Sequence, residues 1–169
     1  MWPDSFETDG LLLKKLTKND ADLLQPLLAD PRVANPCGWQ AAKTMADVRK
    51  RVEKLIKFNS FLFYEKATGA MVGSASIRFG IDAESEKDDE PELGYFIAPS
   101  AWGKGYAAEG SRPLIDYAFK ELGSKAVWVC TDIDNPGSQR VAEKLGFSFL
   151  RTNKGYGSQK DELVYILNR

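Results

Sequence analysis

The sequence feature that most constrains the fold is a glycine-rich segment, Trp-Gly-Lys-Gly-Tyr-Ala-Ala, at residues 102–108. It lies between a predicted strand over residues 93–98 and a predicted amphipathic helix over about residues 104–122. Glycines let a backbone approach an anion closely, and the first turn of a helix offers unpaired N–H groups and the positive end of its dipole. We therefore expect Gly103 and Gly105 to form a diphosphate-binding turn where a strand meets a helix.

The glycine pattern alone fits other classes of protein. Gly103, Gly105 and Ala108 also satisfy the dinucleotide fingerprint, so a dinucleotide-dependent oxidoreductase is an alternative. Against it, residues 99–102 separate the strand from the first glycine, where the dinucleotide fold turns tightly. Asp132 also lies beyond the position expected for the ribose-binding acid, about 20 residues on. A glycine loop that only caps a helix is the third interpretation.

The rest of the chain predicts an α/β fold with a mixed sheet. A hairpin implies antiparallel strands, and the strand-helix-strand order after residue 92 implies parallel ones. Residues 81–92 carry seven acidic residues and one lysine, which predicts an exposed loop that is either simply solvated or attracts a cationic acceptor. The predicted strands are residues 9–15, 61–65, 71–79, 93–98, 126–131, 147–150 and 163–167, and the predicted helices begin near residues 20, 43, 104 and 136.

Composition excludes several classes of protein. A formal net charge of −1 argues against a dedicated nucleic-acid binder, and the apolar runs are too short to cross a membrane. The chain has no histidine, and its cysteines, Cys37 and Cys130, lie far apart, so we expect no metal site. We expect a single domain over residues 1–169, and cytoplasmic localisation because residues 1–4 lack the features of a secretory signal.

A second motif follows the glycine turn. Asn-Pro-Gly-Ser at residues 135–138 opens a predicted helix, and Glu-Lys-Leu-Gly-Phe at residues 143–147 closes it. Together with Glu-Leu-Gly-Tyr-Phe-Ile at residues 92–97, the two motifs resemble the GNAT superfamily of N-acetyltransferases, and most of all its RimJ/RimL-like subgroup. The strong match covers residues 91–149, and the element order alone matches over nearly the whole chain.

The resemblance implies a fold and a co-substrate. The fold is a mostly antiparallel mixed sheet of about seven strands, flanked by helices on both faces, with a V-shaped opening between its two central parallel strands. The co-substrate is acetyl-CoA, whose pantetheine arm would lie in that opening against backbone groups of Phe96 and Ala98. Trp102 departs from the Gln or Arg of the wider superfamily. The implied cofactor-binding residues are Phe96, Ile97, Ala98, Trp102, Gly103, Lys104, Gly105, Tyr106, Ala107, Asn135 and Ser138.

The implied reaction is direct transfer of an acetyl group to a primary amine in a ternary complex. Glu92 is the candidate general base, and a backbone N–H of its strand would polarise the thioester carbonyl. Ala142 stands where many family members have a Tyr that acts as the general acid. Ser138 is therefore the candidate acid, unless its hydroxyl only caps the helix. Tyr156 and Tyr165 stay open for the same role.

The acceptor and the assembly are not fixed by any motif. The acceptor is a small-molecule amine or a protein N-terminus, and the protein is a monomer or a homodimer that binds neither nucleic acid nor membrane. A non-catalytic acyl-CoA-binding or sensing module is the rival function. Such a module would need the two glycines and Asn135 but neither Glu92 nor Ser138.

Overall fold

One eight-stranded sheet runs through the computed structural model, which describes residues 1–169 except for the side chain of Ile81. The strand order is β1-β2-β3-β4-β5-β6-β8-β7, and only β5 and β6 are parallel neighbours. The mixed, mostly antiparallel sheet expected from the sequence is thus confirmed. The strands are β1 Ser5–Glu7, β2 Leu11–Lys15, β3 Phe61–Glu65, β4 Met71–Arg78, β5 Glu92–Ile97, β6 Ala126–Asp132, β7 Ser148–Asn153 and β8 Glu162–Asn168.

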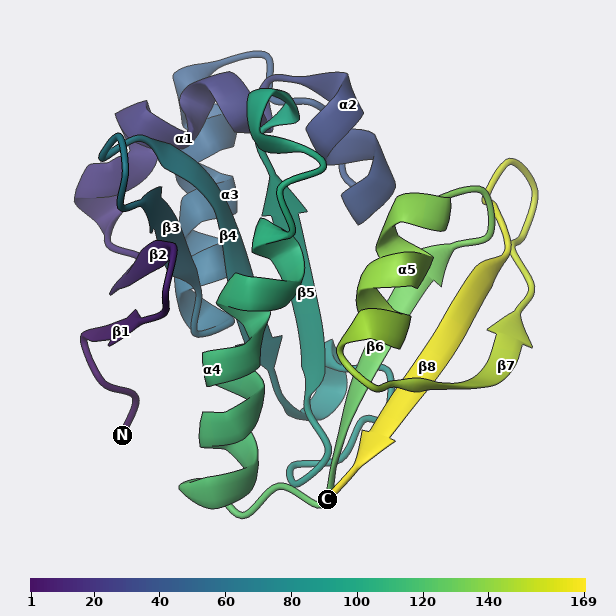
Figure 1. The fold of residues 1–169 in the computed structure, drawn as a ribbon. Coiled ribbons are helices and arrows are strands. Elements are labelled where there is room, and N and C mark those ends of the chain that lie inside the picture. The colour runs from purple at the N-terminus through teal and green to yellow at the C-terminus, as the bar shows by residue number, and fades with distance from the viewer.

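Helices cover both faces of the sheet, as Figure 1 shows. Helices α4 and α5 contribute to the apolar core on one face, while α1 and α3 form a second core with the other face. None of the helices in the described part of the chain combines the length and apolar character needed to cross a membrane. The helices are α1 Ala21–Leu28, α2 Pro31–Ala34, α3 Met45–Lys57, α4 Tyr106–Lys120 and α5 Pro136–Lys144, joined by short 3-10 turns such as η2 Asn35–Cys37.

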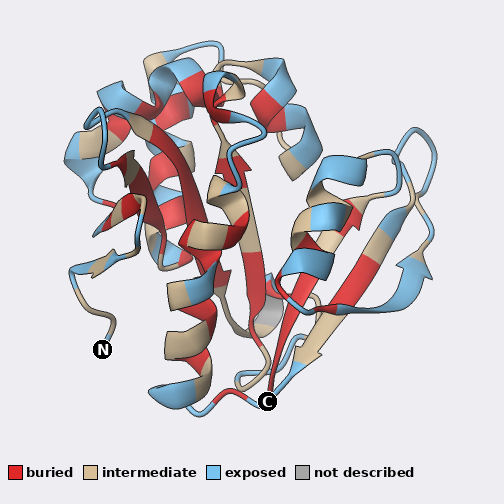
Figure 2. Ribbon diagram, in the orientation of Figure 1, coloured by how far each residue is buried: buried red, intermediate tan, exposed pale blue. Residues whose placement is uncertain are grey.

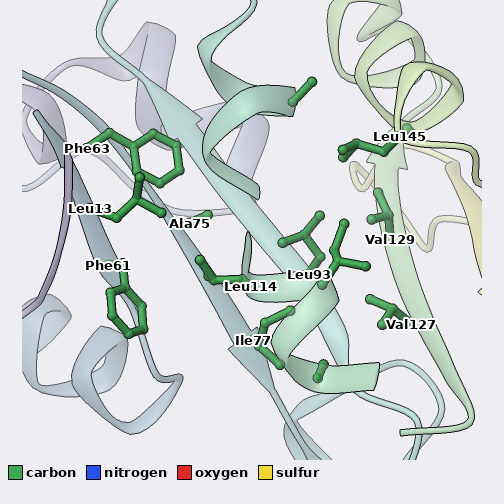
Figure 3. Packing of buried hydrophobic residues seen from close by; sticks show 14 of the residues in the cluster. Leu13, Phe61, Phe63, Ala75, Ile77, Leu93, Leu114, Val127, Val129 and Leu145 are labelled. Atoms are coloured by element: carbon green, nitrogen blue, oxygen red, sulfur yellow. The ribbon is translucent and has the colours of Figure 1, made fainter. Parts of the chain in front are cut away.

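The packing of α4 against the sheet determines how far its first turn lies from the strands. Figure 3 shows Leu114 directed onto β4 and β5, near Ile77 and Leu93. Gly110 faces Phe63 so closely that a Cβ at this position would lie 2.4 Å from the ring. Only a glycine fits there, and α4 therefore lies close against the sheet.

Strands β5 and β6 diverge soon after they meet. They share a single paired position, Glu92 with Trp128, whereas β6 and β8 are paired over their full lengths from Ala126 to Asp132. Figure 1 shows β5 and β6 spreading apart toward α2 and α5. The divergence confirms the predicted V-shaped opening and leaves backbone groups of β5 without a neighbouring strand.

Two features differ from the sequence-based expectation. The sheet gains an eighth strand, β1, whose Phe6 packs among the rings of Trp2, Phe61 and Tyr117. Its three residues are too few to show an alternating pattern. Among its described side chains, the acidic segment 81–92 is exposed only at Asp82 and residues 86–88, because its end enters the buried strand β5 at Glu92. Strand β7 is an edge strand and is exposed along most of its length, as Figure 2 shows.

Candidate active site

A cavity of about 660 Å³ occupies the opening between β5 and β6. Its walls include the glycine turn before α4, helix α5, the segment of α2 and η2, part of β4, and the closed end where β5 meets β6. Most of the predicted site residues line it, while Lys104 and Ala98 do not. The lining includes Cys37, Trp39, Arg78, Glu92, Tyr95, Phe96, Ile97, Trp102, Gly103, Gly105, Tyr106, Ala107, Asp132, Asn135, Ser138, Arg140, Lys144 and Glu162.

The glycine turn has the conformation that an anion-binding backbone needs. Gly103 and Gly105 have φ angles of 79° and 81°, in the left-handed region that favours glycine. Gly105 is the N-cap of α4 and makes no side-chain capping bond. The N–H groups of the first helical turn have no intrahelical acceptor, so they remain available to a ligand.

A lysine that sequence reasoning did not assign lies beside this turn. The Nζ atom of Lys144 lies 3.2 Å from the position that a Cβ of Gly105 would take. Lys144 and Arg140 are one helical turn apart on α5, line the cavity, and form no ion pair among the described residues. The sequence signal was the Lys of the motif at residues 143–147, which we interpreted only as a helix end.

Side chains of the turn point back to the sheet. The Tyr106 hydroxyl, the Thr68 hydroxyl and the Lys104 ammonium all bond the carboxylate of Glu65 and hold its pKa down at about 2. The Trp102 indole N–H donates to the Ile97 carbonyl at 2.9 Å. These contacts anchor the turn, so that its backbone rather than its side chains is left to meet an anion.

The backbone of β5 presents alternate residues to the opening. The Ala98 N–H donates to the Val72 carbonyl at 2.8 Å and so faces the β4 side. The Ile97 carbonyl accepts from the Trp102 indole, and the Tyr95 carbonyl lies 3.9 Å from Cys37 Sγ. Because backbone groups alternate along a strand, Tyr95 and Ile97 offer their N–H groups to the opening. The backbone groups of Phe96 and Ala98, which we expect at the pantetheine arm, instead face β4.

A hydrogen-bonded pair of hydroxyls bridges the opening. Tyr95 Oη lies 2.8 Å from Ser138 Oγ and 3.0 Å from the Ser138 carbonyl. Burial raises the pKa of Tyr95 to about 12, despite the bond from Ser138. Asn135 Oδ1 accepts the Ser138 N–H at 3.1 Å, so Asn135 caps α5 and the Ser138 hydroxyl is free of that role. Tyr95 is a site residue that the sequence analysis missed, although it belongs to the motif at residues 92–97.

Glu92 lies at the closed end of the cavity and is 3% exposed. Its carboxylate accepts from the Arg78 guanidinium and, at 2.7 Å, from the Glu84 N–H. Two more carboxylates line the cavity, Asp132 and Glu162, which are paired across β6 and β8. Desolvation raises the pKa of both, and in Glu162 repulsion by Asp132 adds to it.

The two cysteines also border the cavity. Burial raises the pKa of Cys37 to about 12 and raises the pKa of Cys130 as well. Both thiols are therefore protonated at neutral pH. A thiol is a poor nucleophile compared with a thiolate, so neither cysteine is set up to carry an acyl group.

Fold and site together define an acyltransferase, and comparisons with known proteins give the family. A family model described as "Acetyltransferase (GNAT) domain" matches residues 10–148. The chain belongs to the GNAT acetyltransferases.

Individual relatives agree with this assignment. An uncharacterized protein YkkB from Bacillus subtilis is 33% identical over 150 residues, which cover 86% of each chain. An uncharacterized N-acetyltransferase p20 from Bacillus licheniformis is 24% identical and matches 96% of this chain and 93% of its own.

Solved structures show the same fold. A GNAT-family acetyltransferase from Bacillus anthracis superposes with a TM-score of 0.83 at 23% identity, over 97% of this chain and 98% of the other. A ribosomal-protein-S5-alanine acetyltransferase from Vibrio fischeri gives 0.77 at 18% identity, over 97% and 96% of the two chains.

Proposed function

We propose that this acyltransferase moves the acetyl group of acetyl-CoA to a primary amine by direct attack in a ternary complex. The observation that carries the proposal is one continuous cavity that starts at the glycine turn, follows the free edge of β5 and ends at Tyr95, Ser138 and Glu92. The turn suits a diphosphate, and the hydroxyl pair and the carboxylate suit proton transfer. GNAT membership supplies the reaction class.

The residues of the turn fit coenzyme A. The first-turn N–H groups of α4 and the left-handed backbone at Gly103 and Gly105 would cradle the diphosphate, with Lys144 adding a positive charge. The backbone of Ile97 would pair with the pantetheine arm, and the Asn135 amide N–H₂ would donate to it. Trp102, Tyr106 and Ala107 line the same turn, and Phe96 lines the cavity farther along β5. Lys104 contributes its backbone only.

Tyr95 and Ser138 would handle the leaving group. Bound acetyl-CoA supplies the acetyl thioester, and the Tyr95 N–H is placed to donate to the carbonyl oxygen as negative charge builds on it. The Ser138 hydroxyl would protonate the departing sulfur and recover a proton from the Tyr95 hydroxyl, 2.8 Å away. Tyr95 then takes a proton from water in the cavity. This pair would take the role of the Tyr that many family members have at the position of Ala142.

Glu92 would accept the proton of the amine. Each of its carboxylate oxygens accepts one hydrogen bond, which leaves a second lone pair on each for an ammonium group or a water. Asp132 and Glu162 are alternative bases, because a raised pKa brings a carboxylate closer to the range where it takes up a proton near neutral pH.

The acceptor is a small amine or a protein N-terminus. The latter is favoured by the RimJ/RimL-like relationship and by the S5-alanine activity named for the Vibrio fischeri structure. We also propose a single domain over residues 1–169, because the two apolar cores lie on opposite faces of one sheet. A monomer or homodimer in the cytoplasm is the setting consistent with these acceptors.

The rival function is binding without turnover. A sensing module has no need of a buried tyrosine hydroxyl bonded to a serine inside the acyl-binding cavity, so the Tyr95–Ser138 contact favours catalysis. The test is release of free thiol from acetyl-CoA with a panel of amines and peptides, joined to mass spectrometry of the product. We expect equal amounts of thiol and acetylated amine. Tight binding of acetyl-CoA with no acetylated product from any amine class would support the sensing module.

A further inference from the structure

A second cavity, of about 490 Å³, adjoins the reaction cavity. The two share one lining residue, Trp39, whose ring meets Phe96 edge-on at 5.8 Å between centroids. Phe96 packs in the apolar core of α1 and α3, whereas the glycine turn belongs to α4 on the other face. The second cavity therefore lies on the α1 and α3 side of β5, away from the turn that suits coenzyme A.

The second cavity is lined by cations. Lys50, Arg51 and Lys54 follow one another on a face of α3, and Lys43 comes from the segment before this helix. Its one carboxylate, Asp47, accepts the Lys43 and Thr44 N–H groups at 2.9 Å and caps α3.

None of the four cations has a carboxylate partner in an ion pair among the described side chains, although Arg51 and Lys54 each lie over an aromatic ring. No ion pair and no side-chain hydrogen bond of the four is recorded in the part of the chain that the structure describes. Glu53 of the same helix is paired elsewhere, with Lys18 at 3.6 Å. The cavity thus holds four cations against the single carboxylate of Asp47, which leaves an excess of positive charge.

Arg51 shows that this charge is partly desolvated. Its guanidinium carbon lies 4.5 Å from the centre of the Trp39 ring, and desolvation lowers its pKa. A guanidinium carries five N–H donors, and those of Arg51 have no acceptor among the described residues. Burying a charge without a partner is costly, and an oxyanion from a ligand would remove that cost.

We propose that this cavity, the basic pocket, is an oxyanion subsite for the acceptor. The acceptor places its amine in the reaction cavity and a carboxylate or phosphate group beyond Trp39, against Arg51, Lys50 and Lys54. The preferred substrates are therefore amines that carry an anionic group on the same molecule. This inference rests on the proposed acetyl transfer, since it names the acceptor class of that reaction.

The test compares two double variants of the same helix. Lys50→Gln with Lys54→Gln removes two charges from the basic pocket, and Arg49→Gln with Lys57→Gln removes two from α3 positions that do not line it. Glutamine keeps a helix propensity close to that of lysine and arginine. Each protein is assayed with peptides that share an N-terminus and differ only by Glu or Gln at positions 2–5, which an extended chain spaces about 3.3–3.6 Å apart. Ethanolamine and phosphoethanolamine form a second pair.

The readout is the ratio of kcat/KM for the anionic and the neutral acceptor of each pair. The wild type and the Arg49/Lys57 variant should prefer the anionic acceptor, and the Lys50/Lys54 variant should lose roughly three- to tenfold of that preference, mainly through KM. A preference for the Glu peptide over the Gln peptide would identify the bound oxyanion as a side-chain carboxylate. A preference for phosphoethanolamine over ethanolamine would identify the acceptor as a small phosphorylated amine. An equal loss in both variants, or no preference in the wild type, would overturn the subsite. Calorimetry with acetyl-CoA and thiol release with the neutral acceptor report separately on the proposed function.

Discussion

Replacing Tyr95 with Phe tests the proton pathway with little change in shape. The substitution removes one hydroxyl and keeps the partly buried ring that packs against the core. Two contacts vanish, to Ser138 Oγ at 2.8 Å and to the Ser138 carbonyl at 3.0 Å. The backbone N–H of residue 95, which we assign to the thioester carbonyl, remains in place.

The magnitudes separate a catalytic role from a structural one. A lost hydrogen bond costs about 0.5–1.5 kcal/mol of stability, which lowers the melting temperature by roughly 2–6 °C for a chain of this size. Loss of a general acid lowers turnover by about 10²–10⁴, and a donor that acts through Ser138 belongs at the lower end, near 10². That loss is about 2.7 kcal/mol of activation free energy, more than the change in stability can explain.

The assay is a double-mutant cycle on kcat with Tyr95→Phe, Ser138→Ala and the double variant. Groups that act in series are non-additive, so the double variant should be no slower than Ser138→Ala alone. Acetyl-CoA affinity, measured by calorimetry, should stay within about threefold of wild type in all three. Because the pKa of Tyr95 is about 12, wild-type turnover should show no loss from tyrosine ionisation below about pH 11.

Three results would refute the reasoning. Additive losses would mean that the two hydroxyls act independently. Full activity of Tyr95→Phe would mean that Ser138 needs no donor behind it. A loss of turnover that alkaline pH restores would point to deprotonation of the amine, since a missing proton donor to the thiolate is not relieved by alkali.

Four further predictions concern the glycine turn and the carboxylates. Gly105→Val should abolish the rise in melting temperature that acetyl-CoA produces, because a β-branched residue resists φ near 81° and its side chain would meet Lys144; normal binding by a folded variant would contradict the turn assignment. Lys144→Gln should weaken acetyl-CoA binding about three- to tenfold and should change turnover only through the KM for acetyl-CoA; an unchanged calorimetric affinity would be the opposing result. Glu92→Gln should lower turnover by about 10²–10⁴ with a deficit that shrinks at high pH, and a constant deficit would exclude its role as base. Glu65→Gln should flatten the loss of stability in acid: the lowered pKa of Glu65 stabilises the fold above about 4.5 and is lost as pH falls toward 2, so unchanged acid melting curves would refute this anchor.

Sequence reasoning predicted the elements that carry a strong local signal. The strand, glycine turn and helix around residue 103 combine a buried strand, positive-φ glycines and an amphipathic stripe, and the structure has each of them. The hairpin at residues 61–78 and the cap of α5 at Asn135 follow the same logic. Each of these features depends on neighbours in sequence.

The missed features depend on residues that are distant in sequence. Tyr95 meets Ser138 only because β5 and β6 diverge and α5 closes one side of the opening. Lys144 at the end of α5 lies beside Gly105 at the start of α4. The Arg78 partner of Glu92 comes from the neighbouring strand, whose register no local pattern fixes. Such contacts follow from tertiary packing, which a single sequence does not reveal.

The central claim is that coenzyme A lies along β5 with its sulfur at the Tyr95–Ser138 pair, and a crystal structure of the coenzyme A complex tests it most directly. The distance to measure joins the sulfur and Ser138 Oγ. We expect about 3–4 Å, with the diphosphate on the N–H groups of the Gly103–Gly105 turn. A sulfur far from Ser138, or a diphosphate bound away from this turn, would contradict it.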